Sequence, residues 1–168
     1  MSDRSSRSRS AGRPRSSIRA SRIPGRVEAA RNSGVLSSTD SNRTLIDAAR
    51  RARRHAQAGF SGFKVGAALE THDGTIITGC NVENATYGLT MCAERVAMFK
   101  ALSEGHRRFR RVAVVADTEA PTPPCGSCRQ ILWEFGGDLE VLLANLRRHT
   151  GTYRLAELLP LPFDARLL

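Results

Sequence analysis

Residues 90–95 of the chain read Thr-Met-Cys-Ala-Glu-Arg, and residues 124–128 read Pro-Cys-Gly-Ser-Cys. Cys92 and the two cysteines of the second segment have a spacing that allows them to bind one metal ion. Three protein ligands leave the fourth position of a tetrahedral zinc ion open for water. Glu94 follows Cys92 by two residues, where its carboxylate could move protons to and from such a water. The two segments therefore predict a catalytic zinc site formed by Cys92, Cys125 and Cys128 with Glu94.

The alternative is a closed structural zinc site that includes the fourth cysteine of the chain, Cys80. Structural sites usually take their ligands from two closely spaced pairs, and Cys80 has no partner cysteine nearby. We therefore expect Cys80 to be a small buried apolar residue. The four histidines lack ligand spacing and are expected at the surface, at positions 55, 72, 106 and 149.

Both cysteine segments are expected at the beginning of a helix, at residues 91–101 and 126–135. The N-terminus of a helix favours negative charge, so it stabilises the thiolate form of a cysteine. Three thiolates and one Zn²⁺ together carry one net negative charge, which opposes ionisation of a bound water. We expect Arg95 to offset this charge by donating a hydrogen bond to a ligand sulfur.

Strands and helices alternate along the rest of the chain, which is typical of a layered α/β domain with some parallel strand pairing. This domain is predicted to span residues 43–168. The expected elements, in chain order, are a helix from about Thr44 to Gly59, a hairpin with strands at 65–69 and 75–78, a loop at 81–90, the helix at 91–101, a strand at 111–117, the helix at 126–135, a strand at 140–144 and a short helix at 155–159.

Residues 1–42 are predicted to be a disordered extension rich in arginine and serine. They contain nine arginines and three acidic residues, so more than half of the net charge of +10 lies there. A segment of this composition buries too little apolar surface to offset the entropy lost on ordering. A transit peptide, a nucleic-acid tether and a stretch upstream of the true translation start are the remaining interpretations.

The cysteine content favours a reducing compartment, and we expect the protein to be cytoplasmic. Three of its four cysteines have ligand spacing, which requires reduced thiols. No run of 18 apolar residues exists, so no membrane-spanning segment is predicted. No apolar core follows the basic N-terminus, which argues against a secretory signal.

Residues 79–95 read Gly-Cys-Asn-Val-Glu-Asn-Ala-Thr-Tyr-Gly-Leu-Thr-Met-Cys-Ala-Glu-Arg and resemble the central segment of the small, homotetrameric cytidine deaminases. Residues 124–130 resemble the second zinc motif of that family, and residues 63–69 and 157–163 resemble its flanking segments in the expected order. The resemblance covers about residues 43–163. It implies a three-layer α/β/α fold with a mixed sheet of about five strands, one Zn²⁺ per subunit and a homotetramer.

The resemblance also implies roles for individual residues. Cys92, Cys125 and Cys128 would bind zinc, and Glu94 would shuttle protons while zinc-bound hydroxide attacks the pyrimidine. The implied substrate contacts are Asn81 and Glu83 to the ribose 3′-hydroxyl, the ring of Phe63 to the pyrimidine, the backbone amide of Ala93 to the pyrimidine carbonyl, and Phe163 to the site of a neighbouring subunit. One departure from the family pattern is Gly59-Phe60-Ser61, where the family has Pro-Tyr-Ser.

The expected activity is hydrolytic deamination of free cytidine and deoxycytidine, as in pyrimidine salvage. Glu83 disfavours a polynucleotide substrate because a carboxylate at the ribose 3′ position repels a 3′-phosphate. The sequence also argues against nucleic-acid binding, because the nine aromatic residues form no evident stacking platform. Deamination of a cytosine-nucleoside antibiotic, deamination of polynucleotide cytosine and a zinc-stabilised binding module without catalysis are the alternatives.

Overall fold

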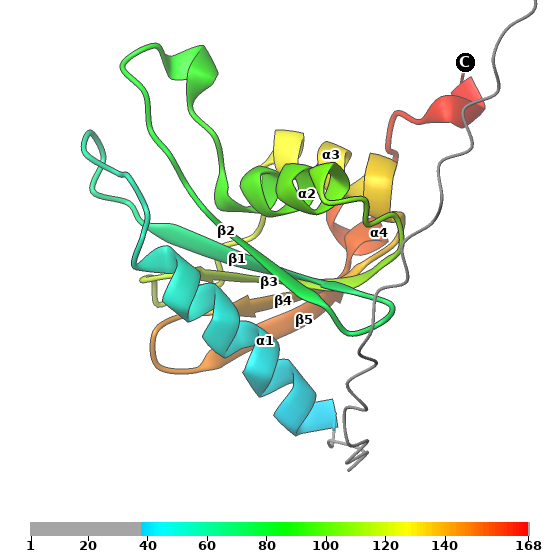
Figure 1. Ribbon diagram of the computed structural model, residues 1–168, viewed down its shortest axis with the longest axis horizontal. Helices are drawn as coiled ribbons and strands as arrows, with labels where there is room; N and C mark the ends of the chain where they lie inside the picture. The colour runs from blue at the N-terminus through cyan, green and yellow to red at the C-terminus, as the bar shows by residue number, and fades with distance from the viewer. Residues whose placement is uncertain (1–37, 168) are drawn as a thin grey trace, which may run out of the picture. The chain divides into compact units, whose positions relative to one another are not determined.

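The computed structural model describes residues 38–167, which contain a five-stranded sheet with helices on both faces (Figure 1). Its elements are α1 (Ser38–Arg53), β1 (Val65–Thr71), β2 (Ile76–Cys80), the 3₁₀ turn η1 (Tyr87–Leu89), α2 (Ala93–Ser103), β3 (Phe109–Ala116), α3 (Gly126–Gly136), β4 (Glu140–Ala144), β5 (His149–Arg154), α4 (Leu155–Leu158) and the 3₁₀ turn η2 (Ala165–Leu167). Among these described residues, none of the helices is long and apolar enough to cross a membrane.

The strands lie in the order β2-β1-β3-β4-β5. β1 pairs antiparallel with β2 and β3, β3 pairs parallel with β4, and β4 pairs antiparallel with β5. A parallel pair requires a crossover connection, and α3 supplies it between β3 and β4. The sheet is therefore mixed, as predicted.

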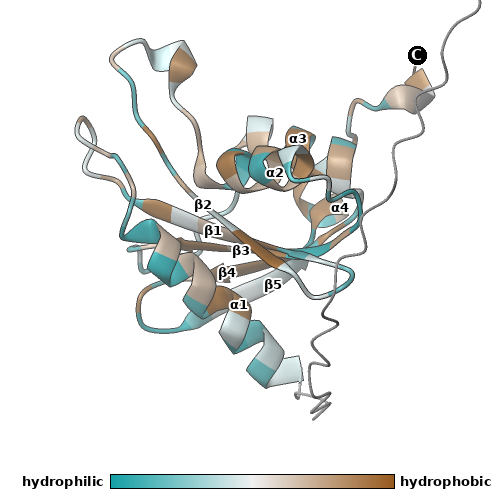
Figure 2. Ribbon diagram, viewed as in Figure 1, coloured by the Kyte–Doolittle hydropathy of each residue, from teal (hydrophilic) through white to brown (hydrophobic). Residues whose placement is uncertain are grey.

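The two faces of the sheet are covered by different helices because successive side chains of a strand point in opposite directions. Ala68, Ala113 and Leu142 pack with the buried face of α1. Leu69 and Val112 belong to the opposite cluster, which includes residues of α2, α3 and α4. Figure 2 shows hydrophobic residues along the central strands β3 and β4. The predicted three-layer α/β/α arrangement is confirmed.

Two glycines allow the helices to approach the sheet closely. A Cβ on Gly66 in β1 would lie 2.1 Å from the carbonyl oxygen of Ala49 in α1. A Cβ on Gly79 in β2 would lie 2.5 Å from both the carbonyl oxygen of Ala93 and the amide nitrogen of Ala97 in α2. The first turn of α2, which follows Cys92, therefore lies directly on β2.

Helix α1 begins at Ser38, so the prediction of a start near Thr44 is wrong by six residues. The cause is a tertiary contact: the buried Arg111 of β3 pairs with Glu70 and also donates hydrogen bonds to the side chains of Ser41 and Asn42. Residues 38–42 of the predicted disordered extension are consequently helical. The rest of that predicted extension, residues 1–37, lies outside the described residues.

Two further elements differ from the sequence prediction. Strand β5 was not predicted, and α1 ends at Arg53, before the predicted end at Gly59. β5 is a partly exposed edge strand of sequence His-Thr-Gly-Thr-Tyr-Arg, which lacks the apolar alternation of a half-buried strand. Its pairing with β4, for example Tyr153 with Val141, is what defines it. α1 ends at Arg53, and the following residues up to Lys64 form turns and a loop.

Candidate active site

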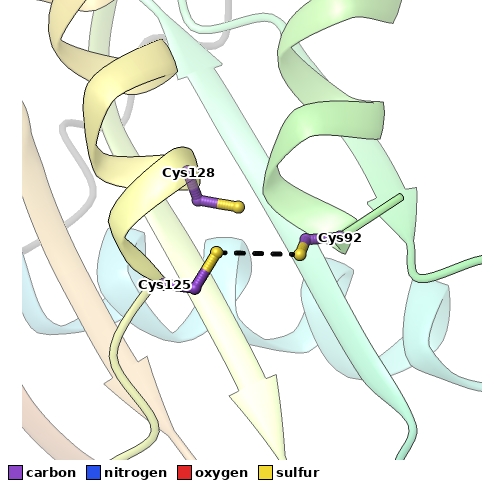
Figure 3. Close-up of side chains that lie close together, drawn as sticks. All are labelled: Cys92, Cys125 and Cys128. Carbon is purple, nitrogen blue, oxygen red and sulfur yellow. Dashed lines mark hydrogen bonds between the residues drawn. The ribbon is translucent and has the colours of Figure 1, made fainter. Parts of the chain in front are cut away.

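The three predicted zinc ligands come from the N-termini of two helices (Figure 3). Cys92 is the N-cap residue of α2, Cys125 is the N-cap residue of α3, and Cys128 lies in the first turn of α3. Their Sγ atoms all lie within 4.8 Å of one another, and those of Cys92 and Cys125 are 3.8 Å apart. A tetrahedral zinc ion with bonds of about 2.3 Å places two sulfur ligands about 3.8 Å apart. The cluster therefore fits zinc.

Cys80 is not part of this cluster, which argues against the closed four-cysteine site. The described residues contain no other group of three or more His, Cys, Asp or Glu side chains close enough to hold a metal ion. The side chain of Cys80 is only partly buried, so the expectation of a buried residue is wrong. Cys80 is the last residue of β2, an edge strand whose residues alternate between buried and partly buried.

The pKa values of Cys92 and Cys128 are shifted by their neighbours in the cluster, and that of Cys92 also by Arg95. A hydrogen bond with Cys128, together with Arg95 and Cys125, lowers the pKa of Cys92 to about 5. The same hydrogen bond and burial raise the pKa of Cys128. The Nη2 group of Arg95 lies 3.6 Å from the Cys92 sulfur and donates to the carbonyl of Thr90 at 3.1 Å. These contacts favour the thiolate form of Cys92, and a bound cation would displace the remaining protons from the cluster.

Glu94 lies in the first turn of α2 and is almost completely buried. Burial raises its pKa to about 7, because a low-dielectric environment disfavours the charged carboxylate. A neighbouring cation would lower that pKa again. A carboxyl group that titrates near neutral pH can both accept and donate a proton, which suits a general acid and base.

A cavity of about 270 Å³ opens in front of the cysteines. It brings together most of the residues selected from the sequence: Phe63, Asn81, Glu83, Cys92, Ala93, Glu94 and Cys125. Some of the other lining residues were not expected from the sequence, among them Ser61, Thr122 and Pro123. These three lie outside the helices and strands, and loop residues that line a cavity follow no periodic pattern.

The segment after β2 is held beside the cysteines by backbone pairing. Val82 and Met91 exchange two hydrogen bonds of 2.9 Å, and the amide of Glu83 donates to the carbonyl of Gln57 at 2.8 Å. Residues 83–90 therefore form a loop that is closed by the pairing of Val82 with Met91. Glu83 begins this loop, and Cys92 directly follows Met91. This pairing places the predicted substrate-binding residue Glu83 and the predicted zinc ligand Cys92 at the same cavity.

The side chain of Asn81 makes two hydrogen bonds to the backbone, in addition to its predicted contact with a sugar. Its Oδ1 atom accepts from the amide of Val65 and its Nδ2 atom donates to the carbonyl of Phe63, both at 2.8 Å. These bonds fix the backbone on either side of Lys64 and thereby hold Phe63 at the edge of the cavity. An amide oxygen and an NH₂ group each retain capacity for one more hydrogen bond.

Phe163 lies outside the cavity and is largely exposed. The side chain of Gln130 in α3 donates a hydrogen bond to its carbonyl, which fixes the C-terminal segment to the helix that carries Cys125 and Cys128. The predicted contact of Phe163 with a neighbouring subunit stays a prediction.

Three comparisons identify the proteins that the chain resembles. Residues 39–144 match the family model described as the cytidine and deoxycytidylate deaminase zinc-binding region. A cytidine deaminase of Sporosarcina psychrophila is 51% identical over 121 residues, which cover 71% of this chain and 89% of that protein. The crystal structure of cytidine deaminase from Burkholderia pseudomallei is 50% identical, with a TM-score of 0.70, and the match covers 72% of this chain and 98% of that one.

A blasticidin-S deaminase of Bacillus cereus is more distant, with 30% identity over 107 residues that cover 59% of this chain and 76% of that protein. The matched range of the family model, residues 39–144, includes all three clustered cysteines. The geometry of the cluster and the zinc-binding family model together confirm the predicted zinc cofactor. The fold, the cysteine cluster and these relatives show that the chain belongs to the cytidine deaminase family.

Proposed function

We propose that the protein is a zinc-dependent hydrolase that converts cytidine and deoxycytidine into uridine and deoxyuridine with release of ammonia. The supporting observation is a cluster of three cysteines, two of which line a single cavity of about 270 Å³ together with one buried carboxyl group. Pockets for drug-sized ligands usually measure about 300–1,000 Å³, so this cavity suits a small ligand such as a nucleoside.

The proton transfers are assigned to Glu94. Zinc held by the three cysteines would supply a water molecule that ionises near neutral pH. Glu94 accepts a proton from the attacking water and delivers it to N3 of the pyrimidine. The oxygen of that water bonds to C4, and the same carboxyl then transfers the proton of the new C4 hydroxyl to the exocyclic amine, so that the C4–N bond breaks, ammonia leaves and a C4 carbonyl forms. Burial raises the pKa of Glu94 and a zinc ion nearby would lower it, and these opposing effects keep both protonation states accessible.

The substrate is held at both of its ends. The first amide of helix α2, that of Ala93, has no acceptor within the helix and can donate to the pyrimidine carbonyl. The ring of Phe63 packs against the base, and Asn81 and Glu83 receive the ribose 3′-hydroxyl. A 3′-phosphate would meet the carboxylate of Glu83, which favours a free nucleoside over a polynucleotide.

The protein is proposed to act as a cytoplasmic homotetramer in which Phe163 completes the site of a neighbouring subunit. The isolated chain leaves several large apolar side chains more than half exposed, among them Phe60, Tyr87, Leu161 and Phe163. Such residues are common where subunits meet. Sedimentation of the purified protein measures the assembly directly.

The decisive experiment is the substitution Glu94→Gln, which keeps the shape of the side chain and removes its ability to accept a proton. Uridine formation from cytidine should fall by at least about 10²–10⁴-fold, since general acid–base catalysis contributes that much. Zinc content should stay at the parent level. Glu104→Gln, at the opposite end of the same helix, is the matched control.

The parent protein is tested in parallel with cytidine, deoxycytidine, blasticidin S and single-stranded DNA, with and without a chelator. Turnover of the two nucleosides that the chelator abolishes is the expected result. Exclusive turnover of blasticidin S or of DNA would replace the proposed substrate. A Glu94→Gln protein as active as the parent would refute the assigned proton transfers.

A further inference from the structure

The Glu83 carboxylate, which the proposed function places at the sugar, is held by a set of donors from the loop between α1 and β1. Its Oε2 atom accepts from the amide of Phe60 at 2.8 Å and from the amide of Ser61 at 3.1 Å. Its Oε1 atom accepts from the hydroxyl of Ser61. Two of the three donors therefore belong to Ser61.

The arrangement leaves one acceptor position open. A carboxylate has about four lone-pair sites, two on each oxygen. Both sites of Oε2 and one site of Oε1 are used, and in the described part of the chain Oε1 has no second donor. Since Glu83 and Ser61 both line the cavity, the remaining site of Oε1 is available to a ligand there.

The direction of the Ser61 hydrogen bond is fixed by a neighbour. The amide of Phe63 donates to the Ser61 Oγ atom at 2.9 Å, so that oxygen acts as an acceptor toward Phe63 and its single proton points to Glu83. Gly62, with a φ of 72°, lies in the left-handed region that lets the chain turn back between the two residues. Ser61 thus connects the residue proposed to hold the base with the residue proposed to hold the sugar.

We infer that Ser61 is a positioning residue that sets the sugar selectivity of the site, by orienting Glu83 so that its one open acceptor site receives a hydrogen bond from a sugar hydroxyl. This inference rests on the proposed nucleoside deaminase function. Three donors also keep the carboxylate charged, since the hydrogen bonds from the Ser61 hydroxyl and from the Phe60 and Ser61 amides lower the pKa of Glu83. A charged carboxylate accepts only, so the sugar must offer a donor.

The consequence is specific: the site should reject a nucleoside that lacks the hydroxyl, and this rejection should depend on Ser61. Ser61 cannot donate to the sugar, because its only proton is already committed to Glu83. Loss of the Ser61 hydroxyl should leave Oε1 without its donor while the two amides still hold Oε2, so the carboxylate can turn about Oε2 and its contact with a sugar hydroxyl weakens. For a sugar without that hydroxyl only the hydrogen bond from the Phe63 amide is lost, so its reaction should change less.

The test compares deoxycytidine with 2′,3′-dideoxycytidine, two substrates that differ only in the 3′-hydroxyl. The zinc-loaded parent, Ser61→Ala and Ser61→Thr proteins are assayed for kcat/KM with each. Ser61→Ala should lower kcat/KM for deoxycytidine by about tenfold, the effect expected for one hydrogen bond to a charged group. The value for dideoxycytidine should fall by a smaller factor, because it loses only the anchoring of the Phe63 amide, and Ser61→Thr should keep the parent ratio of the two values, because it retains the hydroxyl.

Two further variants separate this role from a general effect on folding. Ser103→Ala removes another hydroxyl, bonded to the carbonyl of Lys100 at the far end of α2, and should leave both values at the parent level. Adding Ser61→Ala to Glu83→Ala should cause no further change in the ratio of the two substrates, since Ser61 then has nothing to position. An equal loss for both substrates in Ser61→Ala, or an unchanged ratio, would overturn the inference.

Binding of the same two nucleosides to zinc-loaded Glu94→Gln protein, measured by calorimetry, reports the selectivity without turnover. A parent protein that deaminates neither cytidine nor deoxycytidine refutes the proposed function. A preference for deoxycytidine over dideoxycytidine that survives Ser61→Ala, in binding and in turnover, refutes the role of Ser61 and leaves the proposed function standing.

Discussion

The substitution Gly79→Ala should disable the active site from a position that touches no substrate. Gly79 lies in β2, and its missing side chain lets the first turn of α2 rest on the strand. A Cβ there would be 2.5 Å from the carbonyl oxygen of Ala93 and from the amide of Ala97, whereas ordinary contact begins at 3.4 Å. The beginning of α2 must therefore retreat by about 0.9 Å, the difference between these distances.

This displacement moves Cys92 and Glu94 together, while Cys125 and Cys128 remain on α3. Metal–ligand distances tolerate a change of only about 0.2 Å, so zinc affinity should fall. A displacement of about 1 Å in a catalytic group can cost about 10²-fold in rate, and overpacking typically costs about 1–3 kcal/mol of stability. We expect kcat/KM for cytidine to fall by about 10²-fold in protein that is still folded.

Gly66→Ala is the matched control because it places the same methyl group under a helix that carries no zinc ligand. Its Cβ would lie even closer to its neighbour, 2.1 Å from the carbonyl oxygen of Ala49 in α1. It should reduce the free energy of unfolding at least as much as Gly79→Ala, with activity per folded molecule much better preserved. Urea unfolding, zinc content after dialysis against a chelator and kcat/KM provide the measurements. Equal losses of activity in both variants, after correction for the folded fraction, would refute the reasoning.

Two other predictions concern charged side chains. Arg95→Ala should lower zinc affinity by about 10–100-fold, because Arg95 lies 3.6 Å from the Cys92 sulfur as a hydrogen-bond donor. Competition with a chromogenic chelator measures the affinity, and an unchanged value would contradict this role. Arg111→Ala should reduce the free energy of unfolding by about 3–5 kcal/mol, because it leaves Glu70 buried without its close counter-charge. Urea unfolding measures that loss, and the double variant Arg111→Met, Glu70→Gln should recover much of it; a loss below about 1 kcal/mol in Arg111→Ala would contradict the buried pair's importance.

The layered α/β fold and the zinc cluster were predictable because both depend on short-range patterns. Hydrophobic periodicity indicated four of the strands and all of the longer helices. Cys125 and Cys128 lie one helical turn apart, so their sulfur atoms are close in any structure that keeps the helix. Cys92 and Glu94 likewise belong to one helix start, and the remaining step was to infer that the two helix starts meet.

The missed features all depend on partners distant in the sequence. The first residues of α1 have no strong helix signal of their own, and Arg111, some 70 residues later, stabilises them. β5 is an edge strand defined by hydrogen bonds to β4 and not by its polar sequence. Edge strands of this kind escape periodicity arguments because only one of their sides is paired and little of their surface is buried.

The sequence by itself determined which groups are available for the proposed chemistry, namely three thiols, one carboxyl and a nearby arginine, since their spacing on two helix starts is local. Only the tertiary structure decided how the sugar end of the cavity is arranged. Glu83 and Ser61 are 22 residues apart, and their hydrogen bond exists because β2 runs beside β1 and returns the chain to the loop before it. Contacts between segments that the sheet brings together leave no periodic trace in the sequence, so the contact of Ser61 with Glu83 became visible only in the folded chain.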